Sequence, residues 1–300
     1  MKQLVITADD FGAAREVNDA VEAAHVNGAL SAASLMVGAP ACADAVRLAK
    51  RLPSLRVGLH LVLVEGRPVL PARDVPDLVD KDGCFRNDMA ASGARMFFSP
   101  AARAQLAAEI AAQFEAFAAT GLTLDHCNAH KHFHLHPTIL GLMVAIGKRF
   151  GLRAMRVPSE PRNVLAKIER VPASVTGWVM APWLRLMRRQ LRAAGILAPD
   201  NVFGLAWSGH MTKDRLLGLV HHLPEGLSEI YLHPATGGDF PGAAPTYRYR
   251  DELAALLSPE LTQALRDAGV RRGGFADFHQ GEQGGTVVHA SRNGARSSTP

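Results

Sequence analysis

Short apolar runs alternate along this chain with longer stretches in which apolar residues recur every three or four positions. The first run, KQLVIT at residues 2–7, is continuous and contains β-branched residues, as expected of a strand buried on both faces. Residues 15–27 then place Val17, Val21 and Ala24 on one helical stripe. The chain therefore begins with a buried strand followed by an amphipathic helix.

The same strand-and-helix unit is predicted repeatedly along the rest of the chain. Further strands are expected at residues 30–38, 55–63, 122–130, 152–158, 202–210, 227–236 and 270–278. Further helices are expected at residues 41–53, 99–121, 137–150, 172–195, 212–223 and 250–269. Alternation of seven or eight such units is typical of parallel sheet, and this number predicts an α/β fold, a distorted parallel (β/α)7–8 barrel.

The expected elements account for residues 1–279, which we interpret as a single barrel domain. Residues 65–99 form a long Pro- and Gly-containing loop, and a loop of this length in a compact domain is often functional. Residues 280–300 are rich in Gly, Ser and Arg, a composition typical of a disordered tail.

Composition narrows the functional class only slightly. Hydrophobic residues make up 48% of the chain and charged residues 20%, which fits a soluble globular protein. The net charge is +5, but no nucleic-acid-binding motif accompanies it, so we expect no nucleic-acid partner. Three scattered cysteines and an N-terminus without a secretory signal favour a cytoplasmic location.

Five reactive residues fall in or directly after predicted strands. Asp9 and Asp10 end the first strand, and His60 lies in the third. His130 ends the strand at residues 122–130, and His233 lies near the end of the strand at 227–236. Because the carboxyl ends of barrel strands share one face, these side chains are expected to meet in one mouth.

Each of these residues also has a purely structural interpretation. Adjacent aspartates after a strand often cap the next helix. A lone histidine in an apolar strand, such as His60, is more often a satisfied core residue than a ligand. His233 precedes a proline and could be a turn residue. Their predicted convergence, rather than any one of them, indicates a functional site.

One carboxylate with two imidazoles makes a three-point site suited to a catalytic divalent metal. Such a metal lowers the pKa of water to about 7, and a neighbouring carboxylate can then take the proton. A metal ion with a neighbouring base is suited to the metal-assisted hydrolysis of an amide. Two alternatives remain at this stage: a metal carrier without catalysis, and a metal-independent glycosidase with Asp9 or Asp10 paired to a distant carboxylate.

Four motifs resemble those of the YdjC-like carbohydrate deacetylases, the ChbG/HpnK family. They are VITADDFG, VGLHLVL, NAHKHFHLHP and EIYLHPA, in the family's order. The resemblance implies a distorted deacetylase barrel, related in form to those of glycoside hydrolases, that removes N-acetyl groups from amino sugars with one divalent cation, Zn²⁺ or Mg²⁺. By position, Asp10, His60 and His130 resemble the metal ligands, Asp9 the catalytic base, and His233 the general acid.

Within the family, the chain looks most like the hopanoid-biosynthesis branch, HpnK. That resemblance implies a lipid-linked substrate, an N-acetylglucosaminyl hopanoid that is converted to the glucosaminyl hopanoid. A soluble chito-oligosaccharide is the alternative substrate within the same reaction class.

Further polar residues are expected around the site, either touching substrate or supporting the residues that do: His132, His134, Arg156 and Glu160. For Arg156, a simple ion pair with Glu160 is the alternative. His126 and His136 are expected to be structural.

The predicted helix at residues 172–195 is basic and amphipathic. It combines tryptophan and leucine with Arg185, Arg188, Arg189 and Arg192. Such a helix can lie at a membrane surface, so peripheral contact with the inner face of the membrane is one expectation. The alternative is an ordinary barrel helix with solvated arginines. A homodimer is compatible with either interpretation.

Overall fold

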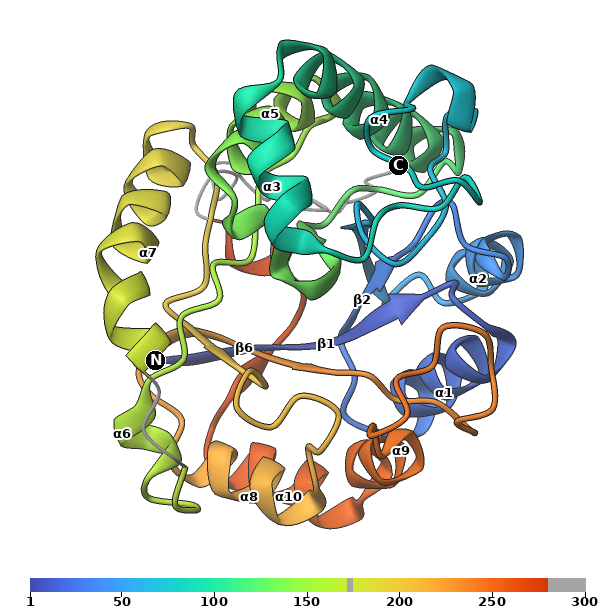
Figure 1. Ribbon diagram of the computed structural model, residues 1–300. Helices are drawn as coiled ribbons and strands as arrows, with labels where there is room; N and C mark the ends of the chain where they lie inside the picture. The colour runs from blue at the N-terminus through green and yellow to red at the C-terminus, as the bar shows by residue number, and fades with distance from the viewer. Residues whose placement is uncertain (172–174, 280–300) are drawn as a thin grey trace, which may run out of the picture.

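A computed structural model describes residues 1–171 and 175–279, and its helices surround a central group of strands (Figure 1). The strands are β1 (Lys2–Phe11), β2 (Ala32–Leu35), β3 (Arg56–Leu61), β4 (Cys127–Ala129), β5 (Asn201–Phe203), β6 (Gly226–Leu232) and β7 (Arg271–Arg272). The α-helices are α1 (Arg15–Asn27), α2 (Cys42–Arg51), α3 (Met89–Phe98), α4 (Pro100–Ala119), α5 (Pro137–Gly147), α6 (Arg162–Leu165), α7 (Val175–Ala193), α8 (Lys213–His221), α9 (Tyr249–Leu257) and α10 (Pro259–Asp267). Short 3-10 helices are η1 (Ala72–Asp74), η2 (His130–Leu135), η3 (Lys148–Phe150) and η4 (Ala276–Phe278).

All the paired strands run parallel, in the order β4-β3-β2-β1-β6-β5, and β7 pairs with the first half of β1. Two isolated parallel bridges, Cys127 with Met155 and Ala154 with Leu197, continue the pairing from β4 toward the segment that enters β5. The sheet therefore curls around on itself. The predicted α/β fold, a distorted parallel barrel, is confirmed.

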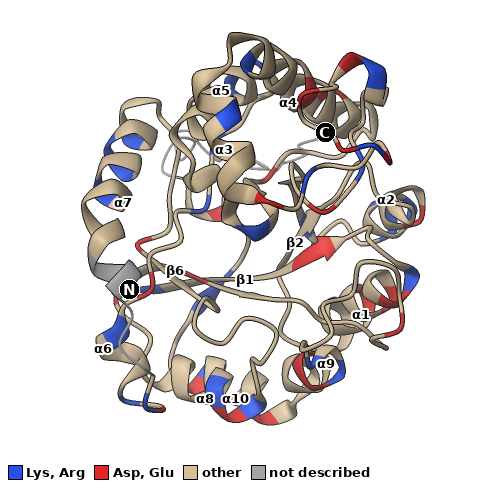
Figure 2. Ribbon diagram, viewed as in Figure 1, with Lys and Arg blue, Asp and Glu red and all other residues tan. Residues whose placement is uncertain are grey.

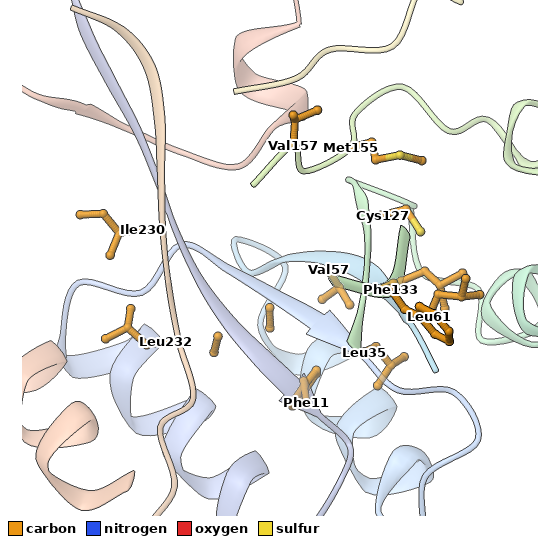
Figure 3. Packing of buried hydrophobic residues seen from close by; sticks show 14 of the residues in the cluster. Phe11, Leu35, Val57, Leu61, Cys127, Phe133, Met155, Val157, Ile230 and Leu232 are labelled. Atoms are coloured by element: carbon orange, nitrogen blue, oxygen red, sulfur yellow. The ribbon is translucent and has the colours of Figure 1, made fainter. Parts of the chain in front are cut away.

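Strand β1 lies at the centre because its sequence is apolar on both faces. It pairs with β2 along one edge and β6 along the other, and its residues from Leu4 to Asp9 are buried. Leu35 of β2, Val57 of β3 and Ile230 of β6 belong to the same buried apolar cluster as Leu4 and Ile6 of β1 (Figure 3). A strand buried this way holds the residues at its end in fixed positions.

The strand predicted at residues 152–158 is reduced to the two isolated bridges. Pro158 has no backbone N–H to donate, so the ladder cannot continue beyond Val157. The strand predicted at 122–130 is likewise shorter, since only Cys127–Ala129 pair as β4.

The strand predicted at 202–210 was also too long. Its last residues leave the sheet at Gly204, whose φ of 122° is unfavourable for other residues. A Cβ at Gly204 would lie 2.5 Å from the backbone oxygen of Tyr231, so the close approach requires glycine. Residues 204–210 therefore form a loop at the mouth of the barrel.

Two helical regions differ from the prediction. The segment at 65–99, expected to be a loop, contains α3, capped by the Asp88 side chain on the Ala91 N–H. The helix expected at 250–269 is two helices, because Ser258 is extended and caps α10 while Pro259 occupies its first turn.

The helix expected at 172–195 is observed as α7, while residues 172–174 and the tail at 280–300 lie outside the described residues. Along the described chain, every helix is too short or too polar to cross a membrane.

Candidate active site

The reactive residues predicted from the strands do converge. Asp9, Asp10, His60, His130 and His233 all line one cavity of about 1030 Å³. They come from the ends of β1, β3, β4 and β6, where the parallel strands finish on one side of the barrel. The acidic end of β1 is visible near the middle of the ring of helices (Figure 2). The predicted common mouth therefore exists.

Asp10, His60 and His130 form a compact ligand set. The Asp10 Oδ1 atom lies 3.2 Å from His60 Nε2 and 3.2 Å from His130 Nδ1, and the two nitrogens are 3.4 Å apart. Metal–ligand bonds of about 2.0 Å around a tetrahedral ion give ligand–ligand distances of roughly 3.3 Å. Asp10 Oδ1 is buried and has no hydrogen-bond donor among the described residues. The donor set therefore fits a divalent cation.

The backbone of β1 changes direction at Asp10 to present this ligand. Its φ is 63°, a left-handed value that Asp tolerates better than most residues with a side chain. The register between β1 and β2 shifts between Ala8 and Phe11, as in a β-bulge. Asp9 and Asp10, although adjacent, therefore contact different groups: Asp10 lies against His60 and His130, whereas Asp9 pairs with Arg156.

Asn128 of β4 orients both sides of the site. Its Oδ1 lies 2.7 Å from His60 Nδ1, so that nitrogen donates and Nε2 keeps its lone pair toward Asp10. Its Nδ2 donates to Asp9 Oδ1 at 3.1 Å and to Ser34 Oγ at 3.0 Å. The sequence places Asn128 on the same strand face as His130 but gives no indication of this role.

Asp9 is held by a buried ion pair with Arg156. Arg156 Nη1 donates to Asp9 Oδ2 at 2.6 Å and Nη2 to Asp9 Oδ1 at 3.0 Å. Arg156 also pairs with Glu229 of β6, through Nε at 3.0 Å and Nη2 at 2.8 Å. Burial opposes ionisation of Asp9, but the Arg156 charge outweighs it and holds the pKa of this carboxyl well below its usual range.

These contacts decide between the alternatives for Arg156. The side chain is 0% exposed, so it fits the expected supporting role and not contact with substrate. The alternative ion pair with Glu160 is wrong, since the partners of Arg156 are Asp9 and Glu229. Glu229 was missed because a glutamate inside an apolar strand looks like a solvent-facing residue.

Glu160 instead organises the loop after β5. Its carboxylate accepts the backbone N–H groups of Gly204, Leu205 and Ala206, at 2.9, 3.1 and 2.9 Å. Burial raises the pKa of Glu160, although these N–H groups act in the opposite direction. Because Leu205 lines the cavity, Glu160 shapes one of its walls from behind.

The histidine-rich segment after β4 folds as η2, with left-handed φ values of 51° and 54° at Lys131 and His132. His132 lines the cavity, and its Nε2 lies 3.0 Å from the Tyr231 hydroxyl. His134 is fully buried and its Nε2 donates to the backbone oxygen of Arg156 at 3.0 Å. Of these two residues, His132 can reach a ligand and His134 supports Arg156.

His134 should make folding stability depend on pH. Burial, together with the Arg156 charge, lowers the pKa of His134 to about 3. In the unfolded chain its pKa is about 6.5, so the stability that the neutral ring contributes is present above pH 6.5 and lost as pH falls toward 3. When the pH is lowered from 7 to 5, the free energy of unfolding should decrease in both proteins. The decrease should be about 2 kcal/mol smaller in His134→Gln than in the native chain.

Urea unfolding of both proteins at the two pH values measures this difference. His221→Gln, a change at an exposed position of α8, is the control and should behave as the native chain. Equal losses in the native chain and His134→Gln would contradict the assignment.

His233 directly follows β6, which lies on the other side of β1 from β3 and β4 in the sheet order. Its ring contacts those of Tyr231 and Tyr247, with centroids 5.7 and 4.9 Å away. Burial lowers the pKa of His233, while the charges of Asp10 and Asp9 act in the opposite direction. A lowered pKa makes the protonated ring a stronger acid.

The contacts of His126 and His136 fit the structural role predicted for them. His126 is 0% exposed and its ring nitrogens lie 3.0 Å from Ser34 Oγ and 2.9 Å from Asp125 Oδ2. The ring of His136 packs near Phe97 and Phe133. Neither lines the cavity.

Residues 3–267 match the family model described as YdjC-like protein. A Geobacillus stearothermophilus protein named carbohydrate deacetylase is 31% identical over 281 residues, covering 92% of this chain and 98% of that protein. A Vibrio vulnificus protein of the same name is 38% identical over 277 residues, covering 88% and 91%. The solved structure of an Enterococcus faecalis protein, named for cellobiose-phosphate cleavage, has the same fold, with a TM-score of 0.73, 22% identity and coverage of 93% and 99%.

Proposed function

Because the chain belongs to the YdjC-like family and is an enzyme of the carbohydrate deacetylase group, we propose that it is a metal-dependent hydrolase of N-acetylglucosamine-type sugars. It removes the N-acetyl group. One observation carries this proposal: three ligand atoms, from Asp10, His60 and His130, lie within 4.8 Å of one another in the same cavity as Asp9 and His233.

Asp10, His60 and His130 would hold the cation, which supplies Lewis acidity that lowers the pKa of water and polarises the acetamide carbonyl. Asp9 accepts a proton from the attacking water. The Arg156 charge makes Asp9 a weak base, so the proton transfer depends on a water that is already acidified. The same ion pair keeps Asp9 ionised and fixed in place.

His233 completes the reaction on the nitrogen side. The oxygen of water bonds to the carbonyl carbon, the carbon–nitrogen bond breaks, and His233 donates a proton to the departing amine. His233 regains a proton as Asp9 loses the one it accepted, so the products are acetate and a free amino sugar. His132, which lines the cavity and contacts Tyr231, is proposed to contact the sugar.

The size and lining of the cavity support a substrate larger than one sugar ring. Its volume of about 1030 Å³ reaches the upper end of the ~300–1,000 Å³ typical of small-molecule sites. Besides the polar residues Asp9, Asp10, His60, His130 and His233, the cavity is lined by the apolar residues Val69, Leu205, Phe240 and Pro241. We propose a lipid-linked amino sugar, an N-acetylglucosaminyl hopanoid, as substrate. A soluble chito-oligosaccharide is the second candidate, since a cavity of this volume can also hold several sugar rings.

Helix α7 supports presentation of such a substrate at a membrane surface. Arg185, Arg189 and Arg192 are exposed, as are Val179 (70%) and Leu186 (45%), and basic residues follow the helix in Figure 2. A basic helix with exposed apolar residues is suited to an anionic membrane surface. Since Cys42, Cys84 and Cys127 are free thiols, we propose that this is the cytoplasmic face.

An acetate-release assay tests the function. The purified chain is incubated with N-acetylglucosamine oligomers and with an N-acetylglucosaminyl lipid in anionic vesicles, each with and without a chelator. Release that the chelator abolishes and added metal restores is expected. Acetate release that survives the chelator would contradict the metal dependence. Cleavage of the oligomers into shorter N-acetylated sugars without acetate release would favour the metal-independent glycosidase class. Metal binding without reaction of either substrate would favour a metal carrier.

A further inference from the structure

A buried carboxylate on α9, which the proposed steps do not use, lies behind His233. Glu252 is 0% exposed. Its Oε2 accepts the backbone N–H of His233 at 2.5 Å, and its Oε1 accepts that of Met211 at 2.9 Å. None of the ion pairs found in the described residues includes Glu252. Its charge is therefore directed at two backbone amides.

These two amides belong to separate segments that border the cavity. His233 directly follows β6, whereas Met211 closes the loop that runs from β5 to α8. That loop contributes Leu205 and Ser208 to the cavity wall. Glu252 thus ties both segments to one helix.

The His233 ring has few polar contacts of its own. Its Nδ1 is buried and lacks a hydrogen-bond partner in the described part of the chain. The His233 ring contacts the aromatic rings of Tyr231 and Tyr247. The direction of the ring therefore depends on where the backbone of residue 233 is held.

We propose that Glu252 is a positioning residue for His233: by accepting its N–H, Glu252 sets the direction from which the imidazole reaches the leaving nitrogen. This inference rests on the proposed role of His233 as proton donor. Glutamine has the same size but only one side-chain oxygen, so Glu252→Gln turns an NH₂ group toward one of the two amides. The substitution disturbs the contact without creating a cavity.

The negative charge of buried Glu252 does not stabilise the fold, so its loss in Glu252→Gln should be tolerated. Burial raises the pKa of Glu252 to about 7, although the N–H groups of Met211 and His233 lower it. The ionisable groups around it are Asp9, His233, Tyr247 and Tyr249. Because the pKa of Glu252 is higher in the folded chain than in the unfolded chain, its protonated form stabilises the fold. This stabilisation is fully present below pH 4.5 and is lost as the pH rises through 7. At pH 8, therefore, glutamine does not remove a stabilising charge.

A double-mutant cycle tests the proposal. In the native chain, Glu252→Gln should lower kcat between about 10- and 100-fold and change KM less than about twofold, because misplacement of a reacting group affects the chemical step. In a His233→Ala background the same change should lower the residual kcat less than about twofold. Equal losses in both backgrounds, or no loss in the native chain, would overturn the proposal.

Asp125→Asn is the matched control. Asp125 is also buried (4% exposed) and accepts two backbone N–H groups, of Phe275 and Ala276, but it is not among the described residues that line the cavity. Its substitution should leave kcat within about twofold of native. A loss equal to that of Glu252→Gln would show a general effect of removing a buried carboxylate and would overturn the proposal.

A readout without turnover separates this inference from the proposed function. The ring resonances of His233, followed by NMR in the full chain, should shift in Glu252→Gln while those of His126 stay unchanged. If the native chain released no acetate from any probe, the proposed function would fail, and the positioning by Glu252 would still be decided by these resonances. An unchanged His233 signal would overturn it.

Discussion

Replacing Asp9 with asparagine should leave the cation bound while lowering kcat by about 10³-fold, the contribution expected of a general base. The ligand atoms belong to Asp10, His60 and His130, so the amide at position 9 removes none of them. Asparagine can still accept a hydrogen bond from Arg156 but cannot take a proton from water. Elemental analysis of the purified variant and acetate release together measure the two effects.

The same substitution should lower stability by about 3 kcal/mol, because Arg156 keeps only Glu229 as a charged partner. Thermal unfolding with and without metal shows whether the variant remains folded at the assay temperature. Asp19→Asn, an exposed position on α1, serves as control and should match the native chain. Full activity in Asp9→Asn would rule out Asp9 as the base.

His130→Ala should lose both metal and turnover. His130 supplies one of three ligand atoms, and loss of a residue that merely orients a ligand already weakens metal binding about 10- to 100-fold. We expect the metal Kd to rise more than about 100-fold and activity to fall to background. Metal titration of the stripped protein, followed by acetate release at each metal concentration, measures both.

His221→Ala, at an exposed site on α8, is the control for loss of a histidine. Unfolding should be little changed in His130→Ala, since this side chain is 19% exposed and forms no part of the apolar core. If His130→Ala bound metal as tightly as the native chain, the ligand set assigned here would be wrong.

The barrel and the convergence of the reactive residues were predictable because both depend on positions along single strands. A buried strand that ends in two aspartates places them at the carboxyl edge, whatever its neighbours are. The same reasoning placed His60 and His130. The individual roles came from the motifs rather than from the pattern, and they remain predictions: ligand for Asp10, His60 and His130, base for Asp9 and general acid for His233.

The supporting residues could not be predicted because their partners come from distant parts of the sequence. Arg156 meets Asp9 and Glu229 only after β1 and β6 pair in register, with Val5 beside Glu229. Asn128 and Glu252 likewise act through contacts that no local spacing reveals. Helix α3 was missed for another reason: it is short and contains Ser92 and Gly93, both poor helix formers.

The cluster around Arg156 has a consequence for which ion the cavity accepts. Its single guanidinium faces the carboxylates of Asp9 and Glu229, and Asp10 lies beside His60 and His130, which carry no charge as metal ligands. Together they carry two more negative charges than positive ones. A divalent cation would bring the total charge of these groups to zero. A monovalent cation would leave it negative, and a trivalent cation would make it positive. We therefore expect the proposed site to bind divalent ions more tightly than monovalent or trivalent ions, whichever divalent metal it takes.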